Sequence, residues 1–325
     1  MKLLFAGTPE VAVPSLQALA DDDAFEIVAV LTRPDAPQGR GRRLVPSPVK
    51  RAALELGIPV LDGNPSDPAF VSELRSTGAE IAAVVAYGRI LRQAALDAMP
   101  LGWYNLHFSL LPQWRGAAPV QRAIWAGDRL SGATVFRITK GLDDGPVIAQ
   151  STVEIGRHET AGSLLGRLSM DGSHLLSMAI KAVASGKARP EPQQQGVFEK
   201  AEKIGVDDAH IDFRAPAYAV ERQIRACTPE PGAWAHLHQD RGNDKPLLMH
   251  VLDAREARYL PDEQPQELKD VVLSPGELLT SKRHVWVGTL TVPLELREVK
   301  LQGRKAMDAS AWARGAHLSD SAFLG

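Results

Sequence analysis

The hydrophobic positions of the first part of the chain fall into short apolar runs separated by longer segments with helical spacing. Apolar runs occupy residues 3–6, 25–31 and 81–86, and each is short enough to be a buried strand. Between these runs, one helical pattern follows the turn at residues 7–10 and ends near Ala20, and another covers about residues 69–76. Strands that alternate with helices are typical of βαβ units, which build a parallel sheet. The pattern therefore predicts an α/β fold with a Rossmann-like, mostly parallel sheet.

The apolar run at residues 103–108 also carries polar residues at alternate positions. Side chains alternate between the two faces of a strand, so Asn105, His107 and Ser109 are predicted to lie on one face. The strand should end at Leu110-Leu111-Pro112, and polar groups at the end of a buried strand mark the place where open α/β sheets keep their ligand crevices. Taken alone, the segment also fits a half-buried edge strand with a satisfied polar face.

The rest of the first domain is predicted to close with a hairpin and a long helix. Residues 133–138 and 147–155 have the pattern of paired strands around a turn, and a helical pattern covers about residues 161–184. Residues 186–203 then lose apolar periodicity and predict a linker. Near the start, Thr8 is a candidate cap for the first helix, with Pro9 at its first position.

The pattern changes after the linker. One helix is expected around residues 217–226, and short β-like runs follow at residues 233–237, 247–251, 285–289 and 294–299. Several short strands separated by turn residues are typical of a small barrel or sandwich, and we expect a five-stranded barrel of the oligonucleotide-binding (OB) kind. The predicted parts are a first domain at residues 1–187, a linker at 188–208 and an OB-like domain at 209–325.

Composition limits the partners and the compartment. The 325 residues fit two domains, and a net charge of −2 gives no overall field that would recruit polyanions or membranes. The single cysteine, Cys227, excludes an internal disulfide framework and fits a reducing cytoplasm. No apolar run approaches the ~18 residues of a membrane-spanning helix. We therefore expect a cytoplasmic protein without a membrane partner.

One segment departs from this neutral balance. Residues 33–51 carry six basic residues and one acid, Asp35, among several prolines and glycines. The segment is long for a connection in a compact domain, where about 4–6 residues are usual. It is predicted to be a loop, either a solvated insertion or an arginine loop that contacts phosphates.

The polar residues suggest acyl-type chemistry at Asn105, His107 and an acid from Asp143-Asp144. A histidine can exchange protons or, as imidazolium, stabilise a developing oxyanion, and an asparagine amide can donate to the same oxygen. A carboxylate can raise the histidine pKa or take a proton from an attacking amine. The sequence has no nucleophile-elbow pattern and no cluster of zinc ligands, so it favours attack by a substrate's own amine on a carbonyl carbon, without a metal.

Two motifs connect these residues with a known family. Asn105-Leu106-His107-x-Ser109-Leu110-Leu111-Pro112 is followed about 36 residues later by Gly141-Leu142-Asp143-x-Gly145. This pair resembles the signature of the folate-dependent formyltransferases. Other strings resemble the members of that family that act on initiator methionyl-tRNA: Phe5-Ala6-Gly7-Thr8-Pro9-Glu10, Gly39-Arg40-Gly41, Pro46-Ser47-Pro48-Val49-Lys50, Val85-Ala86-Tyr87-Gly88, Trp114-Arg115-Gly116-Ala117-Ala118-Pro119 and Leu301-Gln302-Gly303-x-Lys305-x-Met307. Together they extend from residue 3 to about residue 315.

The resemblance implies a reaction and a site. The donor would be 10-formyltetrahydrofolate, and the acceptor would be the α-amino group of methionine on initiator tRNA. It implies catalytic roles for Asn105, His107 and Asp143, whereas Asp144 stands where the family varies and would be a turn residue. The folate would lie against Tyr87, Gly88 and the segment Ser109, Leu110, Leu111 and Pro112.

The resemblance also implies where the tRNA would bind to a monomeric protein. Arg40, Arg42 and Arg43 would meet the acceptor arm, and the C-terminal barrel, including Lys305, would contact the backbone. From His210 to the end, however, 15 Lys and Arg residues stand against 16 Asp and Glu residues. Binding there would need local clusters, of which the candidates are Arg214/Arg222/Arg225, Lys282-Arg283 and Arg297/Lys300/Arg304/Lys305, and a solvated mixed surface is the alternative for each.

Three other functions remain to be weighed. Formyl transfer to a glycinamide ribonucleotide or an amino sugar would use the same three residues but would leave the arginine loop and barrel without a purpose. A nucleic-acid-binding module without catalysis is disfavoured by the intact Asn105, His107 and Asp143. A nucleotide-dependent dehydrogenase is disfavoured because Gly7 alone does not make the G-x-G-x-x-G fingerprint.

Overall fold

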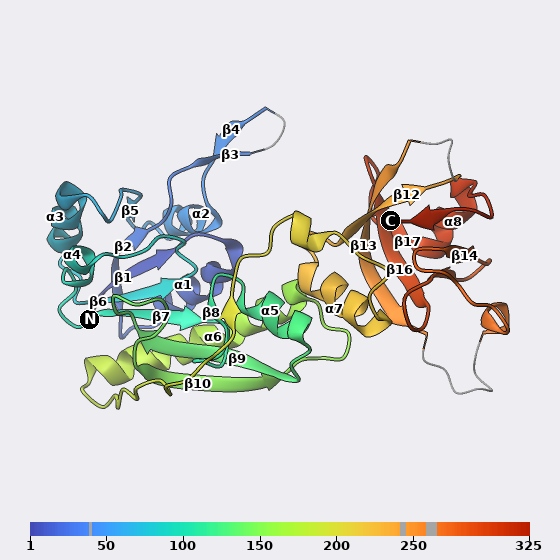
Figure 1. Cartoon of the computed structure of the whole chain (residues 1–325). Helices are drawn as coiled ribbons and strands as arrows, with labels where there is room; N and C mark the ends of the chain where they lie inside the picture. Colours follow the sequence, from blue (N-terminus) through green and yellow to red (C-terminus); the bar gives the residue numbers. More distant parts are fainter. Residues whose placement is uncertain (39–40, 241–244, 258–264) are drawn as a thin grey trace. The chain divides into compact units, whose positions relative to one another are not determined.

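The computed structural model describes residues 1–38, 41–240, 245–257 and 265–325, which form two compact units (Figure 1). Unit 1 contains Met1–Pro119, Leu130–Glu154 and Leu164–Glu202. Unit 2 contains Val120–Arg129, Ile155–Ser163 and Lys203–Gly325. Each unit is therefore assembled from separate stretches of the chain.

Unit 1 is built on a seven-stranded sheet with the order β10-β9-β7-β6-β1-β2-β5. Neighbours in the part β7-β6-β1-β2-β5 pair in parallel, whereas β9 runs antiparallel to β7 and β10 antiparallel to β9. The mostly parallel α/β fold and the hairpin are thus confirmed. The strands are β1 (Lys2–Gly7), β2 (Glu26–Leu31), β5 (Val60–Leu61), β6 (Ile81–Val85), β7 (Trp103–His107), β9 (Leu130–Arg137) and β10 (Val147–Glu154).

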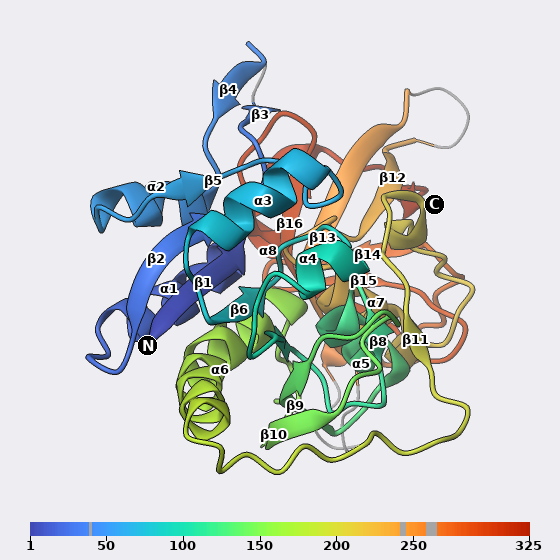
Figure 2. The same ribbon diagram turned by 90° about the vertical axis from the view of Figure 1, so that its left-hand side faces the viewer.

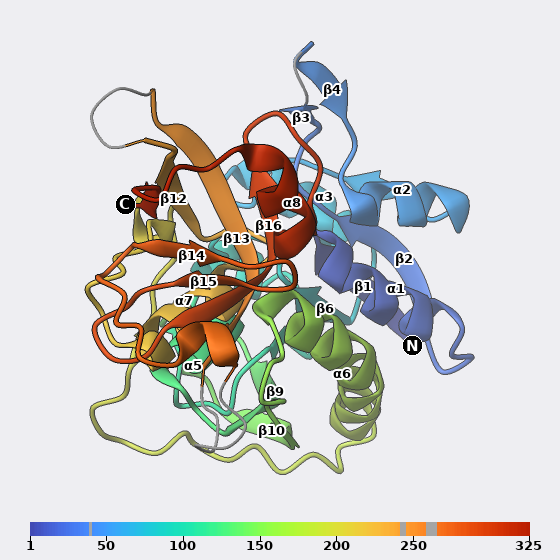
Figure 3. The same cartoon turned by 90° about the vertical axis from the view of Figure 1, so that its right-hand side faces the viewer.

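Helices cover the faces of this sheet. Phe70 and Leu74 of α3 belong to the buried core on one face, together with α4, which lies beside α3 (Figure 2). On α6, Gly172 lies so close to β7 that an added Cβ would be 3.0 Å from Leu106; Figure 3 shows α1 and α6 from the opposite side. The helices are η1 (Glu10–Ala12), α1 (Val13–Ala20), α2 (Pro48–Glu55), α3 (Pro68–Ser76), α4 (Gln93–Leu96) and α6 (Ala161–Ala184). In the described part of the chain, no helix combines the length and the apolar character needed to cross a bilayer.

The strand order reverses next to β1, because β2 lies on one side of it and β6 on the other. Such a switch point opens a crevice at the carboxyl ends of the strands. Thr8 follows β1, and its hydroxyl donates to the Tyr87 carbonyl at 2.9 Å, which joins the two strand ends across that crevice. The prediction that Thr8 caps the first helix is therefore wrong, since its side chain is used between strands.

The basic segment at residues 33–51 is not only a loop. β3 (Ala36–Gln38) and β4 (Arg43–Val45) pair antiparallel as a ribbon that projects from the rest of unit 1 (Figure 1), and α2 follows. At its base, Lys50 Nζ lies 2.7 Å from Asp35 Oδ1. The ribbon went undetected in the sequence because backbone pairing holds it together, without an alternating apolar face.

The segment predicted as a linker lies along unit 1 up to Ala201. Glu191 and Val147 exchange two backbone hydrogen bonds of 2.8 Å. Further on, β11 (Lys200–Ala201) pairs in parallel with β8 (Arg115–Gly116). Gly116 has φ +131°, and a Cβ there would lie 2.6 Å from the Ala201 carbonyl oxygen, so this close approach requires glycine.

Unit 2 is a nearly closed antiparallel barrel, as the sequence predicted, but among the described residues its sheet has seven strands rather than the expected five, because β17 and β18 are short segments without an apolar run of their own. Its strand order is β14-β15-β16-β13-β12-β18, and a bridge between Glu277 and Phe323 joins the two ends of that order. Trp286 and Val299 are fully buried inside it, and Cys227 is a buried residue at the end of α7. The elements are α5 (Pro119–Ala126), η2 (Asp207–Ala209), α7 (Ala217–Cys227), β12 (Trp234–His238), β13 (Leu247–Glu256), η3 (Gln266–Leu268), β14 (Leu278–Thr280), β15 (Val285–Val287), β16 (Leu294–Leu301), β17 (Met307–Asp308), α8 (Ala309–Ala316) and β18 (Phe323–Leu324).

Candidate active site

A cavity of about 630 Å³ opens in unit 1 at the carboxyl ends of β6 and β7. Its wall includes Tyr87 and Gly88 after β6, Asn105 and His107 on β7, and the turn that contains Asp143. The volume falls within the roughly 300–1,000 Å³ of ordinary ligand pockets. The cavity also lies beside the switch point of the sheet, where α/β folds bind ligands.

Strand β7 presents two of the three predicted catalytic residues. It pairs with β6 on one side and with β9 on the other, and Asn105 and His107, two residues apart on this strand, therefore share a face and both line the cavity. The prediction of a shared face is confirmed for these two residues. It is wrong for Ser109, because β7 ends at His107 and the Ser109 hydroxyl instead donates to the Gln113 carbonyl at 2.7 Å.

His107 is a buried histidine with a defined orientation. Its Nε2 lies 2.9 Å from the Trp114 carbonyl oxygen, and since a carbonyl only accepts, Nε2 carries the proton of the neutral ring. Nδ1 is thereby left as the unprotonated nitrogen, 3.9 Å from Asp143 Oδ2. Burial lowers the pKa of His107, and the opposing charge of Asp143 and the Trp114 carbonyl only partly offset this effect. The ring is therefore neutral near pH 7 and can take up a proton at Nδ1.

Asp143 has an unusual backbone conformation, and its carboxylate is hydrogen bonded to a neighbouring segment. It has φ +49°, a left-handed conformation that is uncommon outside glycine. The Gly116 N–H donates to its Oδ2 at 2.9 Å, which fixes the position of the carboxylate. The adjacent Asp144 is exposed and accepts a hydrogen bond from the Thr139 hydroxyl at 2.5 Å within the same turn. Of the two acids, Asp143 is the one that lines the cavity.

The predicted donor-binding residues divide into two groups. Tyr87 and Gly88 line the cavity, and burial raises the pKa of the Tyr87 hydroxyl, an effect that the Arg89 and Arg33 charges oppose. The turn that follows β7 contains Ser109, Leu110, Leu111 and Pro112. These four residues are not among the described residues that line the cavity.

The predicted tRNA-binding residues are placed on exposed elements of two units. Arg42 and Arg43 are exposed on the β3–β4 ribbon of unit 1, and Arg42 has φ +47°. Arg40 lies outside the described residues. Lys305 is exposed in the turn after β16 of unit 2.

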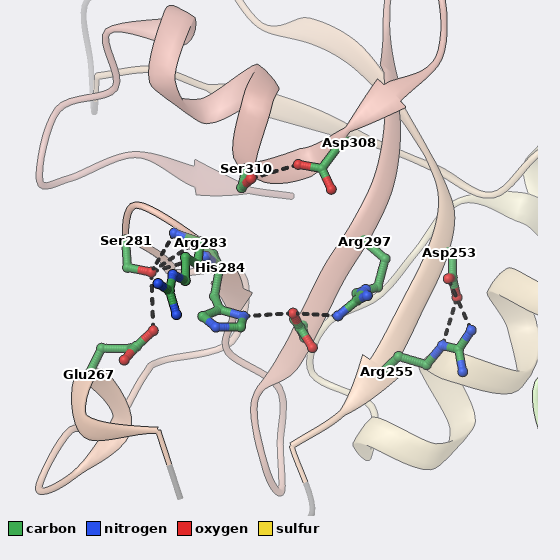
Figure 4. Close-up of polar contacts among 10 residues, drawn as sticks. Asp253, Arg255, Glu267, Ser281, Arg283, His284, Arg297, Asp308 and Ser310 are labelled. Carbon is green, nitrogen blue, oxygen red and sulfur yellow. Dashed lines mark hydrogen bonds and ion pairs between the residues drawn. The ribbon is translucent and has the colours of Figure 1, made fainter.

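Several basic residues proposed for unit 2 are engaged by acids. Arg297 Nη1 lies 3.0 Å from Glu295 Oε1, which is also 2.8 Å from His284 Nδ1 (Figure 4). Arg214 Nε lies 2.8 Å from Asp212 Oδ1, and Arg225 Nε lies 2.7 Å from Glu221 Oε1. These pairs reduce the positive charge that the clusters can offer to a polyanion.

Three residues of the site were not singled out individually by the sequence. Trp114 holds His107, Gly116 holds Asp143, and the buried Gln193 donates to the Asp143 and Gly145 carbonyls. The string that contains Trp114 and Gly116 was noted only as part of a resemblance. Gln193 lies in the segment predicted as a linker, where no periodicity or motif distinguished it from its neighbours.

The arrangement can perform proton transfer and stabilise an oxyanion. An amide, an imidazole and a carboxylate face one cavity, which is the set needed for attack by an amine on a carbonyl carbon. Among the described residues, no group of three or more His, Cys, Asp and Glu side chains is placed to hold a metal ion.

Comparison with known proteins gives consistent matches over both units. Residues 1–180 match the family described as formyl transferase, and residues 203–317 match the formyl transferase C-terminal domain. The chain is 61% identical over 324 residues to the methionyl-tRNA formyltransferase of Bifidobacterium adolescentis, which covers 99% of each protein. It is 59% identical to that of Bifidobacterium animalis subsp. lactis, over 100% of this chain and 99% of the relative. The fold also matches an N-formyltransferase from Helicobacter canadensis, solved with folinic acid and dTDP-3-aminofucose, with a TM-score of 0.62 at 17% identity over 91% of this chain and 98% of that one.

Proposed function

The chain belongs to the formyl transferase family, and within it to the methionyl-tRNA formyltransferases, and from this premise we propose how its residues carry out the reaction. The protein transfers the formyl group of 10-formyltetrahydrofolate to the α-amino group of methionine on initiator tRNA. The product is formylmethionyl-tRNA, which serves translation initiation. Asn105, His107 and Asp143 are the proposed catalytic residues.

The reaction needs an oxyanion site and a path for one proton. The methionine amine attacks the formyl carbon, so that a new C–N bond forms and the carbonyl oxygen becomes an oxyanion. The Asn105 amide donates a hydrogen bond to that oxyanion. His107, once it takes up a proton at Nδ1, donates a second one from that nitrogen, because Nε2–H is bound to the Trp114 carbonyl whereas Nδ1, at 3.9 Å from Asp143 Oδ2, is too far for a direct hydrogen bond to it. Such donors are most effective in a site that excludes water. The bond to the folate nitrogen then breaks, and the proton lost by the amine replaces the formyl group on that nitrogen.

Asp143 has two tasks in this scheme. Its carboxylate takes the proton from the amine as the C–N bond forms, directly or through a water molecule, and that proton then passes to the folate nitrogen as the formyl group leaves it. It also favours the imidazolium form of His107, whose Nδ1 faces Oδ2 at 3.9 Å. One observation carries the proposal: His107 and Asp143 face each other in the wall of a cavity that Asn105 also lines.

The donor is proposed to enter the cavity along Tyr87 and Gly88. Both residues line its wall, and Gly88 has φ +80°, so that the chain turns there without a side chain in the way. Contacts of the folate with Ser109, Leu110, Leu111 and Pro112 remain a prediction from the resemblance. Their support is proximity in sequence to His107.

The tRNA is proposed to contact basic residues of both units. The ribbon would present Arg42 and Arg43, with Arg40 beside them in sequence, to the acceptor arm, and Lys305 of unit 2 would contact the backbone. Exposure of Arg42, Arg43 and Lys305 supports this assignment. We also propose a catalytic domain at residues 1–187, a linker at 188–208 and a tRNA-binding domain at 209–325.

One assay tests the acceptor. The protein is incubated with labelled 10-formyltetrahydrofolate and, separately, with charged initiator tRNA, free methionine, glycinamide ribonucleotide and a nucleotide-linked amino sugar. Label should enter only the aminoacyl-tRNA. Equal labelling of free methionine or a small ribonucleotide would contradict a role for the ribbon and barrel in selecting the acceptor. We further propose that the protein acts as a monomer in the cytoplasm, which light scattering and cell fractionation would test.

A further inference from the structure

The side chain of Gln193 is fully engaged although it lies in the extended segment between α6 and β11. It is 7% exposed, and its Oε1 accepts from Arg115 Nε at 2.9 Å and from Nη2 at 2.5 Å. Its Nε2 donates to the Asp143 and Gly145 carbonyls, both at 2.8 Å. All four hydrogen-bonding positions of the amide are thus used. Since Arg115 can only donate and the two carbonyls can only accept, the orientation of the amide is also determined.

We propose that Gln193 is a positioning residue for formyl transfer, which holds the Asp143 turn so that the carboxylate faces His107. This inference rests on the catalytic role proposed for Asp143. The two carbonyls bound by Gln193, those of Asp143 and Gly145, lie in the turn that begins with the positive φ of Asp143, a conformation that persists only where surrounding contacts fix it. The Gly116 N–H holds the carboxylate end of the same residue. Gln193 therefore fixes the backbone of Asp143, and Gly116 fixes its side chain.

Residues 114–116 connect these contacts with His107. The Trp114 carbonyl binds His107 Nε2, Arg115 binds Gln193, and the Gly116 N–H binds Asp143. The segment after Gln193 holds this stretch in turn, because the Trp114 N–H donates to the Glu199 carbonyl at 3.0 Å and β11 pairs with β8. The side chains of His107 and Asp143 are thus both hydrogen bonded to the stretch 114–116. Gln193 connects the turn that contains Asp143 to the same stretch through Arg115.

Gln193→Met tests the inference in the full-length protein. Methionine has a similar length but neither donates to the turn nor accepts from Arg115. We expect kcat for charged initiator tRNA to fall roughly 10- to 100-fold, because a displacement of about 1 Å at a catalytic group can cost on the order of 10²-fold. KM values should change little. The matched control is Gln194→Met, at an exposed neighbouring glutamine, which should keep the parent kcat.

Two further measurements separate positioning from a general loss of structure. If Gln193 acts through Asp143, adding Gln193→Met to Asp143→Asn should cost no more than about twofold beyond Asp143→Asn alone, since residues that act as a unit are not additive. In the protein without substrates, NMR titration of His107 should move in the same direction for Gln193→Met as for Asp143→Asn, because both weaken the influence of the carboxylate.

Each outcome decides one claim. Parent kcat and an unchanged His107 titration in Gln193→Met would overturn the positioning role. So would full additivity with Asp143→Asn. If Gln193→Met does not fold, Gln193→Glu replaces it, since Glu keeps the partner for Arg115 but faces two carbonyls with a carboxylate; parent kcat in that variant would equally overturn the inference. Parent kcat in Asp143→Asn would instead refute the proposed role of Asp143, and the NMR titration would still decide whether Gln193 positions it.

Discussion

The Nδ1 atom of His107 lies 3.9 Å from the Oδ2 atom of Asp143, a distance slightly longer than a direct hydrogen bond. The opposite ring nitrogen is bound to the Trp114 carbonyl, and the Asp143 oxygen is bound to the Gly116 N–H. Both groups are therefore aimed at each other by adjacent backbone atoms. A proton taken up by Nδ1 would face the carboxylate, which makes the pair suited to share the charge changes of the transfer.

The choice between the two adjacent acids can be tested directly. Asp143→Asn should lower kcat severely, because the amide can neither accept the amine's proton nor support a charged His107. Asp144→Asn should be mild, since Asp144 is exposed and bonds only the Thr139 hydroxyl among the contacts seen. Steady-state formylation of charged initiator tRNA measures both. Similar damage from the two changes would mean that the acid has been assigned wrongly.

Asn105 is expected to contribute an oxyanion donor. Asn105→Ala should reduce kcat on the order of 10²–10³-fold, which is typical for loss of one such donor, with little change in tRNA affinity. Asn105→Asp should be at least as slow, because it keeps the shape but places a negative charge beside the developing oxyanion. Kinetics with both substrates at saturation provide the measurement. A variant without the amide that keeps parent kcat would remove Asn105 from the mechanism.

Burial of His107 should make stability depend on pH. Because its folded pKa is below the unfolded value of 6.5, the unfolded chain binds more protons as the pH falls through 6.5, and the free energy of unfolding should decline there. The contribution is fully present above the unfolded pKa. His107→Gln should lose less stability than the parent between about pH 7.5 and pH 5, as measured by urea unfolding. His174→Gln, at an exposed position of α6, serves as the control and should follow the parent.

The ribbon is expected to bind nucleic acid through arginine. Arg42→Ala should weaken binding of charged initiator tRNA by about 1–3 kcal/mol if its guanidinium makes a bidentate base contact, and the salt dependence should flatten by roughly one unit of slope if it contacts a phosphate. Donor binding should not change. Arg75→Ala, an exposed arginine at the end of α3, is the matched control. Filter binding at several salt concentrations distinguishes a contact from a merely solvated ribbon, which would leave both quantities at parent values.

Local pattern determined much of the fold. The apolar runs that form β1, β2, β6 and β7 are short and continuous, and segments with helical periodicity separate them. Residue type alone therefore predicted strands that are buried on both faces of a parallel sheet. The helix Ala161–Ala184 and the barrel strands followed from the same periodicity. Placement of Asn105 and His107 on one face needed only the two-residue repeat of a strand. The ribbon β3–β4 escaped because its pairing is made by the backbone, which every sequence possesses.

What the sequence could not supply is the contact network that orients these groups. His107 and Asp143 are 36 positions apart, and Gln193 is 50 positions beyond Asp143. Residues so distant in the sequence are brought together by the sheet and by the chain after α6, which returns along β10 and β8. Three features depend on this arrangement of the chain. They are the ring nitrogen of His107 that carries the proton, the burial that lowers the pKa of His107, and the hydrogen bonds of Gln193. The sequence by itself determined which groups carry the chemistry, because residue type fixes acidity and hydrogen-bonding capacity, whereas only the tertiary structure decided how they face one another, because orientation is set by non-local backbone partners.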